Sequence, residues 1–237
     1  MRQRIRKGIL NFSALLFPIT FMFLSPYIII AGASEGIING SAIIFALLLL
    51  YSILGSRLFC GWLCPGGAVQ EYAAAVNSKP WKGKFKNGLK YLIWVIWLAF
   101  LIYLWIANRP LKADFFFMSG IDIHMTIIYF IVTSLIYFFS IATGRRGVCH
   151  SLCWMAPFMV LGERAADLLH IPRFGLKADS KACISCGQCS RKCPMSLDVQ
   201  EMVKSGRMNS TECINCLECV DNCPKKAIGC GIRRAGK

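Results

Sequence analysis

Long apolar stretches dominate the first part of the chain. They run over Ile9–Ala31, Ile37–Leu58, Leu89–Ala107 and Ile121–Ala142. A helix needs about 20 mainly apolar residues to cross a bilayer, and continuous rather than alternating runs favour helices in lipid. The pattern therefore predicts four membrane-spanning helices. We expect Pro18 and Pro26 to bend the first one, and Arg57 to extend its side chain to the membrane surface.

Basic residues are concentrated in the segments on one side of these helices. They are Arg2, Arg4, Arg6 and Lys7, then Lys79, Lys82, Lys84, Lys86 and Lys90, then Arg145 and Arg146. On the other side, Gly32–Gly40 has no basic residue, and Arg109 and Lys112 are balanced by Asp114 and Asp122. Because Lys and Arg favour the cytoplasmic side, both termini are predicted to be cytoplasmic, in a multi-pass protein of the inner cell membrane.

The N-terminal stretch also has features of a cleaved signal peptide. It combines an Arg-rich start, an apolar run and Ala31-Gly32-Ala33. Cleavage would leave three crossings. The apolar run is longer than a typical signal core, which favours an uncleaved helix.

Composition supports a membrane location. Of the 237 residues, 56% are hydrophobic and 16% are charged, whereas soluble domains average about 25% charged residues. The net charge of +15 lies mostly beside apolar stretches, which indicates an anionic membrane surface rather than nucleic acid. Apolar runs end near Pro172, so we predict a membrane domain over residues 1–172 and a cytoplasmic domain over residues 173–237.

A repeated pattern follows the second and fourth apolar stretches. Its first copy has Arg57, Cys60, Cys64, Pro65 and Glu71, and its second has Arg146, Cys149, Cys153, Pro157 and Glu163. In the second copy, Trp154-Met155-Ala156 separates the last cysteine from the proline. Proline favours the first position of a helix, so the repeat predicts short helices over Pro65–Val76 and Pro157–Leu169, lying in the membrane interface.

The C-terminal region carries the pattern Cys-x2-Cys-x2-Cys-x3-Cys-Pro twice. In this pattern three close cysteines bind one [4Fe–4S] cluster, and the fourth binds the other cluster. The first cluster is therefore assigned to Cys183, Cys186, Cys189 and Cys223, and the second to Cys213, Cys216, Cys219 and Cys193. Zinc sites use pairs of ligands rather than such runs, and cytosolic disulfides are rare. Cys230 lies outside both motifs and is expected to be dispensable for iron binding.

The remaining paired cysteines allow three interpretations. A Cys-x3-Cys spacing puts both thiols on one face of a helical turn, which is half of a ligand set. If the repeats face each other, Cys60, Cys64, Cys149 and Cys153 form a third iron–sulfur site, [4Fe–4S] or [2Fe–2S], at the cytoplasmic interface. They could instead be redox-active or copper-handling thiols, or buried cysteines that merely pack. We expect His150, between them, neither to ligate nor to hydrogen-bond.

Two resemblances follow from these motifs. Residues 178–230 resemble bacterial two-cluster ferredoxins, which implies short helices and small antiparallel hairpins around the clusters. The whole chain, with Phe59-Cys60-Gly61-Trp62-Leu63-Cys64-Pro65, resembles the polyferredoxin-type membrane iron–sulfur proteins. That family includes the membrane ferredoxin subunit of periplasmic nitrate reductase systems and relatives in nitrous-oxide respiration and copper-oxidase maturation. Trp154 departs from the family motif, where proline is expected. The resemblance implies quinol oxidation or electron delivery across the membrane.

The predicted fold is thus an all-α polytopic membrane domain with a small α+β ferredoxin domain. We expect an electron-transfer subunit of an oxidoreductase complex rather than a stand-alone enzyme, working between a cytoplasmic carrier and an acceptor in or beyond the membrane. A copper reduction or assembly factor and a redox-sensing regulator are the alternatives. Residues 173–237 hold 12 Lys or Arg against 6 Asp or Glu, a net charge of +6, which suits anionic lipid or an acidic redox carrier equally.

Residues on the predicted outer side give a weaker signal. Asp114, Asp122 and His124 lie beside Phe115–Phe117, a combination that could serve a quinone site, although polar residues at helix ends are usually just solvated. His124 is the only histidine near a crossing, so no bis-histidine haem site is expected. The sequence has no Gly-rich nucleotide loop, which leaves flavin or nicotinamide chemistry to a partner.

Overall fold

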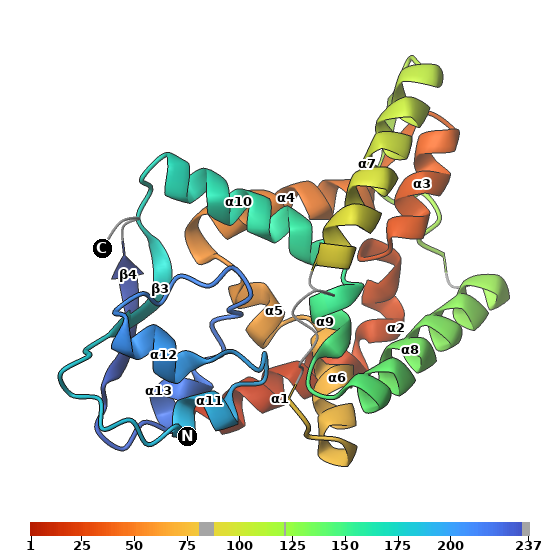
Figure 1. Cartoon of the computed structure of the whole chain (residues 1–237). Helices are drawn as coiled ribbons and strands as arrows, with labels where there is room; N and C mark the ends of the chain where they lie inside the picture. Colours follow the sequence, from red (N-terminus) through yellow and green to blue (C-terminus); the bar gives the residue numbers. More distant parts are fainter. Residues whose placement is uncertain (81–87, 121, 234–237) are drawn as a thin grey trace.

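The computed structural model describes residues 1–80, 88–120 and 122–233. Lys82, Lys84 and Lys86 of the predicted cytoplasmic loop, and Ile121 at the predicted start of the fourth span, lie outside the described residues. Within the described parts, helices form the membrane region, and short helices with a two-stranded sheet form the C-terminal region, which we call the head (residues 173–233; Figure 1).

The N-terminal stretch is not one continuous helix. It divides into α1 (Arg2–Leu15), α2 (Phe17–Thr20), the 3₁₀ helix η1 (Phe21–Phe23) and α3 (Pro26–Ser34). The chain bends by 63° between α1 and the segment Phe17–Phe23. Pro18 and Pro26 lie in the first turns of α2 and α3, where a ring without an N–H starts a new helix instead of continuing the old one. The chain therefore bends at both prolines, as predicted, but as separate helices rather than as one helix over Ile9–Ala31.

The other apolar stretches form three helices of different lengths. They are α4 (Gly40–Gly55), α7 (Leu89–Ala107) and α8 (Ile123–Thr143). Among the described residues, α7 and α8 alone are single helices long and apolar enough to cross a membrane, and the bent N-terminal pair would be a third span if it crosses as one unit. At about 1.5 Å per residue, the 16 residues of α4 fall short of the roughly 30 Å hydrocarbon core.

The ends of the second stretch explain why α4 is short. Residues Ile37–Asn39 form β1, which pairs in parallel with β2 (Lys112–Asp114). Asn39 then caps α4 by accepting from the backbone N–H of Ala42 at 3.0 Å. At the other end, Ser56 has a φ of 50°, and a separate helix α5 (Leu58–Trp62) follows. Arg57, between them, is fully buried against the head, contrary to the expectation that it reaches the membrane surface.

Two further helices follow the Cys-x3-Cys motifs. α6 (Pro65–Val76) has the predicted bounds, whereas α10 (Met155–Leu168) begins two residues before Pro157. Each of these helices packs on the apolar helix of the other repeat: α10 packs on α4, and α6 packs on α8. Gly162 of α10 permits the first contact, since a Cβ there would lie 2.4 Å from the Leu49 carbonyl oxygen. A short helix α9 (Gly147–Ser151) carries Cys149.

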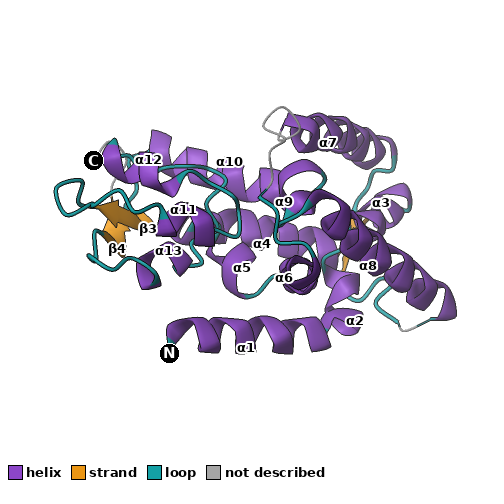
Figure 2. Ribbon diagram, turned by 60° about the horizontal axis from the view of Figure 1, so that its bottom comes forward, coloured by secondary structure: helices purple, strands orange, loops and turns teal. Residues whose placement is uncertain are grey.

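The head is closed by an antiparallel pair of strands, β3 (Arg173–Ala178) and β4 (Ile228–Arg233). Between them lie α11 (Gln188–Lys192), α12 (Val199–Lys204) and α13 (Glu218–Asp221). Figure 2 shows α1 running along the side of the molecule from the head toward α2. Hydrogen bonds from Arg2 and Gln3 of α1 to Asp221 of the head fix this arrangement. The N-terminus and the head are therefore neighbours.

Candidate metal centres

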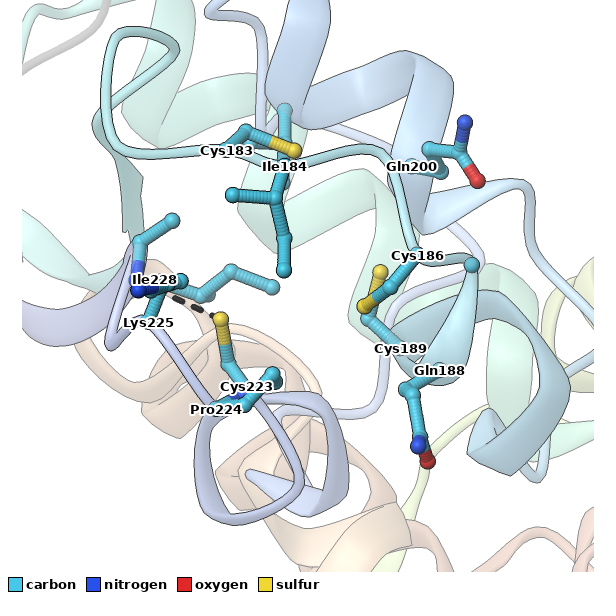
Figure 3. Close-up of a pocket in the computed structure, with 13 residues that line it drawn as sticks. Cys183, Ile184, Cys186, Gln188, Cys189, Gln200, Cys223, Pro224, Lys225 and Ile228 are labelled. Carbon is cyan, nitrogen blue, oxygen red and sulfur yellow. Dashed lines mark hydrogen bonds between the residues drawn. The ribbon is translucent and has the colours of Figure 1, made fainter.

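The first ferredoxin motif forms an open cavity near the protein surface. Its lining includes all four cysteines assigned to the first cluster, Cys183, Cys186, Cys189 and Cys223, around about 350 Å³ of space. Figure 3 shows Cys183 at the top of the cavity, Cys186 and Cys189 together on the right, and Cys223 on the left beside Pro224. The Cys223 sulfur accepts a hydrogen bond from the backbone N–H of Ala227 at 3.3 Å. Cys186 is exposed, so this cavity is the more accessible of the two in the head.

The second motif forms a similar cavity that lies deeper. It is lined by Cys193, Cys213, Cys216 and Cys219, around about 380 Å³ of space. Burial raises the pKa of Cys213 to about 11 and that of Cys216 to about 12. Thiols in such an apolar setting stay protonated unless a metal group binds their anionic form, so loading this site would release protons.

Both cavities are built by the same backbone turn, repeated 30 positions apart. Ser185 and Asn215 have φ angles of 56° and 49°, and Gly187 and Leu217 have angles of 71° and 63°. Left-handed residues are uncommon outside glycine and cluster at functional sites. Here they turn the loop so that successive cysteines face one centre. The fourth cysteine of each motif, just before a proline, lies apart from the first three, and its thiol lines the cavity of the other motif.

The paired cysteines of the helical region before the head are also brought together. Cys60 and Cys149 are buried, and Cys64 and Cys153 are half-buried. Burial raises the pKa of Cys64 well above its usual value, and the nearby Cys60, Cys149 and Cys153 thiols raise it further. Burial also raises the pKa of Cys153 to about 12. We call this group of four cysteines the interfacial thiols.

A cavity of about 500 Å³ lies beside the interfacial thiols. Three of them, Cys64, Cys149 and Cys153, line it, together with mainly apolar side chains such as Phe17, Ile136 and Trp154. Gln70 of α6 joins the two repeats there, because its amide donates to the Cys149 sulfur at 3.1 Å and accepts from the Cys149 backbone N–H at 3.2 Å.

Buried arginines adjoin the interfacial thiols. Arg57 and Arg146 are 0% and 1% exposed. Arg146 donates to the Cys60 carbonyl oxygen at 2.8 Å and to Glu71 at 2.6 Å. Burial raises the pKa of the Cys60 thiol, and the positive charge of Arg57 opposes part of that rise. Among the described residues, Arg57 Nε, Arg57 Nη2 and Arg146 Nε find no hydrogen-bond partner. Buried cations with unused donors suit an anionic group between the thiols.

The head packs directly against the helices that carry the interfacial thiols. The backbone of Gly61, next to Cys60, lies so close to the second ferredoxin motif that a Cβ there would be 2.3 Å from the Ile214 carbonyl oxygen. Trp62 donates its indole N–H to the Asn215 carbonyl oxygen at 3.1 Å. The second cavity of the head, rather than the first, therefore faces the interfacial thiols.

Glu212 of the head forms a hub of charged contacts at the same interface. Its carboxylate lies 2.6 Å from Lys90 Nζ, 3.3 Å from Arg57 Nη1 and 3.6 Å from His150 Nδ1. His150 Nε2 lies 3.0 Å from the Met195 carbonyl oxygen, so the expectation that this histidine forms no hydrogen bond is wrong. Burial lowers the pKa of His150 to about 4, which keeps the ring neutral near pH 7.

Other predicted features lie apart from these centres. Asp114, Asp122 and His124 are exposed, and no ion pair joins them within the described parts of the chain. The ring of Phe115 stacks on that of Phe23, with the ring centroids 5.4 Å apart. Cys230 is exposed on β4 and outside both cavities of the head. Among the described residues, no three or more His, Cys, Asp or Glu side chains are grouped so that they could hold a single metal ion.

The site includes residues that the sequence pattern did not reveal. Gln70, Trp62 and Glu212 each contact a partner at least 79 positions away in the sequence. Their residue types have no fixed spacing from the cysteines that would suggest these contacts. Arg146 and Glu71, by contrast, belong to the repeated pattern, although the pattern gave no sign that Arg146 of one copy pairs with Glu71 of the other.

Comparisons with known proteins agree with the cysteine patterns. A family model described as a 4Fe-4S binding domain matches residues 40–85 and 124–172, which carry the two Cys-x3-Cys motifs. A second, described as a 4Fe-4S dicluster domain, matches residues 175–224. No solved structure matches the chain.

Three curated relatives extend this comparison. The chain is 23% identical to a putative electron transport protein, YccM, of Escherichia coli over 79% of its length and 55% of the relative's. It is 28% identical to the ferredoxin-type protein NapH of Haemophilus influenzae, over 65% of its length and 64% of the relative's. It is 29% identical to an uncharacterized protein, MJ0750, of Methanocaldococcus jannaschii, over 80% and 82% of the two chains. The chain thus spans less than two thirds of the first two relatives.

These matches, the ferredoxin motifs and the two long apolar helices converge on one assignment. The chain carries [4Fe–4S] ferredoxin motifs, is related to electron transport proteins, and has helices suited to a membrane. It belongs to the polyferredoxin-type iron–sulfur proteins.

Proposed function

We propose that the chain is a membrane-bound electron-transfer subunit that connects a cytoplasmic redox carrier with an acceptor in or across the membrane, either the quinone pool or an extracytoplasmic partner. The observation that carries this proposal is the succession of cysteine sites. An exposed site in the head is followed by a buried one, and the buried site adjoins the interfacial thiols. When bound there, iron–sulfur clusters supply the redox centres.

The ligand sets of the head follow the crossed pattern. In this proposal Cys183, Cys186, Cys189 and Cys223 hold the first [4Fe–4S] cluster, and Cys193, Cys213, Cys216 and Cys219 hold the second. Support comes from the two cavities, each of which is lined by one complete set. The head is then a separate cytoplasmic domain over residues 173–237, and residues 1–172 form the membrane domain.

The interfacial thiols hold a third iron–sulfur centre in this proposal. Four mutually close thiols provide a full ligand set, and the adjacent Arg57 and Arg146 supply positive charge where thiolates and sulfide would carry negative charge. Since buried charge is costly unless it is compensated, the unused donors of both arginines support an anionic occupant. The two arginines also pair with Glu212 and Glu71, so it is their remaining donors that plain packing of four cysteines would leave without a purpose.

The docking of the head sets an order among these sites. Cys186 at the first site is exposed and suits exchange with a soluble carrier, and the basic head suits an acidic one. Gly61 and Trp62, which follow Cys60 directly, both contact the backbone of the second ferredoxin motif, so the second site adjoins Cys60. Electrons that enter or leave through the first site therefore pass the second site before they reach the interfacial thiols.

Contacts between the head and the ends of the helices support the proposed topology. Lys90 at the start of α7 binds Glu212 of the head at 2.6 Å, and Arg145, just after α8, donates to the Arg191 carbonyl oxygen of α11. The N-terminal Arg2 also binds the head. All three basic segments thus share one side with it, and the positive-inside rule makes this side cytoplasmic.

A second function deserves a test because of one contact. Cys60 Sγ lies 3.4 Å from the thioether sulfur of the fully buried Met159. Thiolate and thioether are the soft ligands that Cu(I) prefers. A copper-reducing or copper-transferring role of the interfacial thiols is therefore the alternative to a third iron–sulfur centre.

Electron transfer to a membrane acceptor tests the proposal. Purified protein in liposomes would be reduced by a soluble low-potential donor, and reduction of a water-insoluble quinone would be followed optically. We expect Cys153→Ala to leave reduction of the two head clusters intact and to abolish quinone reduction, whereas Cys230→Ala, the matched control, leaves both unchanged. Full quinone reduction by Cys153→Ala would refute a path through the interfacial thiols, and bound copper in place of additional iron would favour the alternative.

A further inference from the structure

A strongly basic cavity, separate from the three that the cysteines line, lies between the membrane domain and the head. It is bounded by α1, α6, the segment before α9, and the head, and it encloses about 1160 Å³ of space including its open mouth. The charged residues that line it are Arg6, Lys7, Arg145, Arg146, Lys192, Glu71 and Glu218. Five cations against two carboxylates give this basic cavity a formal charge of +3.

The two carboxylates are already engaged with the two buried arginines. Glu71 binds Arg6 at 2.7 Å and Arg146 at 2.6 Å, and Glu218 lies 3.6 Å from Arg6. These arginines hold the pKa of Glu71 below its ordinary value, against the opposing effect of burial. At the floor of the basic cavity, the arginines therefore neutralise both carboxylates, and no net negative charge remains there.

The walls carry the positive charge that remains. Among the described residues, Lys7, Arg145 and Lys192 form no ion pair. They come from α1, the segment before α9 and α11 respectively, so three separate parts of the chain converge on one space. Arg145 also donates to the Arg191 carbonyl oxygen, but no described carboxylate neutralises these three cations. A phosphate group fits such a convergence, because it accepts several charge-assisted hydrogen bonds at once.

The surroundings favour a phosphate that belongs to a lipid. On α1, the helix that carries Lys7, the apolar side chains of Ile5, Phe12 and Leu15 are 52%, 63% and 75% exposed. A helix with basic residues on one face and exposed apolar residues on another is suited to the headgroup region of a membrane. The small residues Ala68, Ala74 and Ala75 of α6 leave the basic cavity room for a headgroup.

We propose that the basic cavity binds a phosphate-bearing anion, and that this anion is the headgroup of an anionic phospholipid. Because its walls belong to both the membrane domain and the head, the bound phosphate would brace the head against the membrane surface. The inference is independent of what the interfacial thiols hold, since none of them lines the basic cavity.

The experiment uses the purified full chain in neutral detergent. Short-chain phosphatidylglycerol, short-chain phosphatidylcholine and inorganic phosphate are titrated separately, and the melting temperature reports binding because a ligand of the folded state stabilises it. Native mass spectrometry counts bound lipid. The test variant is Lys7→Gln with Lys192→Gln, and the control is Lys177→Gln with Lys204→Gln, which makes the same charge change at exposed positions outside the basic cavity.

We expect saturable stabilisation by phosphatidylglycerol in the wild type and in the control, with affinity at least about tenfold weaker in the test variant. Equal effects of inorganic phosphate and phosphatidylglycerol, both weakened in the test variant, would support the phosphate site and assign it to a soluble source. Equal stabilisation by phosphatidylcholine, or unchanged phosphatidylglycerol affinity in the test variant, would overturn the proposal.

Discussion

The close approach of Gly61 to the head makes a sharp test of how the two parts fit together. In Gly61→Ala, the new Cβ would lie 2.3 Å from the Ile214 carbonyl oxygen and 3.3 Å from the Cys216 backbone nitrogen. Ordinary contact begins at 3.4 Å, so the head and α5 must separate by about 1.1 Å, the difference between 3.4 and 2.3 Å. The obstacle is backbone, which cannot rotate away as a side chain could.

The expected cost follows from this overlap. Overpacking a well-packed contact costs about 1–3 kcal/mol, and for a chain of this size each kcal/mol lowers the melting temperature by roughly 2–4 °C. We therefore expect Gly61→Ala to melt at least about 2 °C below the wild type. Separation should also slow electron transfer from the head to a membrane acceptor, while the head clusters remain reducible by a soluble donor.

Gly66→Ala provides the matched control. It changes the same residue type five positions away, but its Cβ would meet only the Cys64 sulfur, at 4.0 Å. Gly66 lies within α6, where alanine favours the helix over glycine by about 1 kcal/mol, so this variant should be neutral or slightly stabilised. Equal melting temperatures and electron-transfer rates in Gly61→Ala and Gly66→Ala would show that α5 does not contact the second ferredoxin motif.

Further predictions concern single residues at the sites. Cys193→Ala should remove the paramagnetic signal of the second cluster and leave that of the first, whereas loss of the first alone would reject the crossed ligands. Glu71→Gln should destabilise the protein by about 3–5 kcal/mol in denaturant unfolding, because the buried Arg6 and Arg146 lose their shared carboxylate. Since its pKa is depressed on folding, Glu71 stabilises the protein above its ordinary pKa of 4.5, and this contribution is lost as the pH falls through the depressed value. Glu71→Gln should lack that acid-side loss of stability, and an unchanged pH profile would contradict the network. Cys230→Ser should keep full iron content by colorimetric assay.

The features that the sequence predicted well depend on local pattern. α7 has the predicted bounds, because Leu89–Ala107 is uniformly apolar and has no helix breaker. α6 begins at Pro65 as expected for a proline at the first helical position. The grouping of the head cysteines about two cavities also follows from spacing alone, since the short loops between them leave few conformations.

The features that were mispredicted depend on contacts between distant segments. Apolarity alone suggested a crossing from Ile9, yet α1 lies against the head because Arg2 pairs with Asp221, 219 positions away. Arg57 was placed at the membrane surface by its position near a span, but Glu212 and Thr211 of the head bury it. Periodicity and charge counts say nothing of such pairings, because the partner is chosen by the fold.

The most direct test of the third centre is the iron and sulfide content of the purified protein, measured together with low-temperature paramagnetic resonance. Three [4Fe–4S] clusters correspond to about twelve iron atoms per chain and two to about eight, with about ten for a two-iron third centre. We predict about twelve or ten for the wild type, and about eight for Cys64→Ala with both head signals retained. A wild-type chain with only about eight iron atoms, or a Cys64→Ala chain that keeps its full iron, would contradict the account.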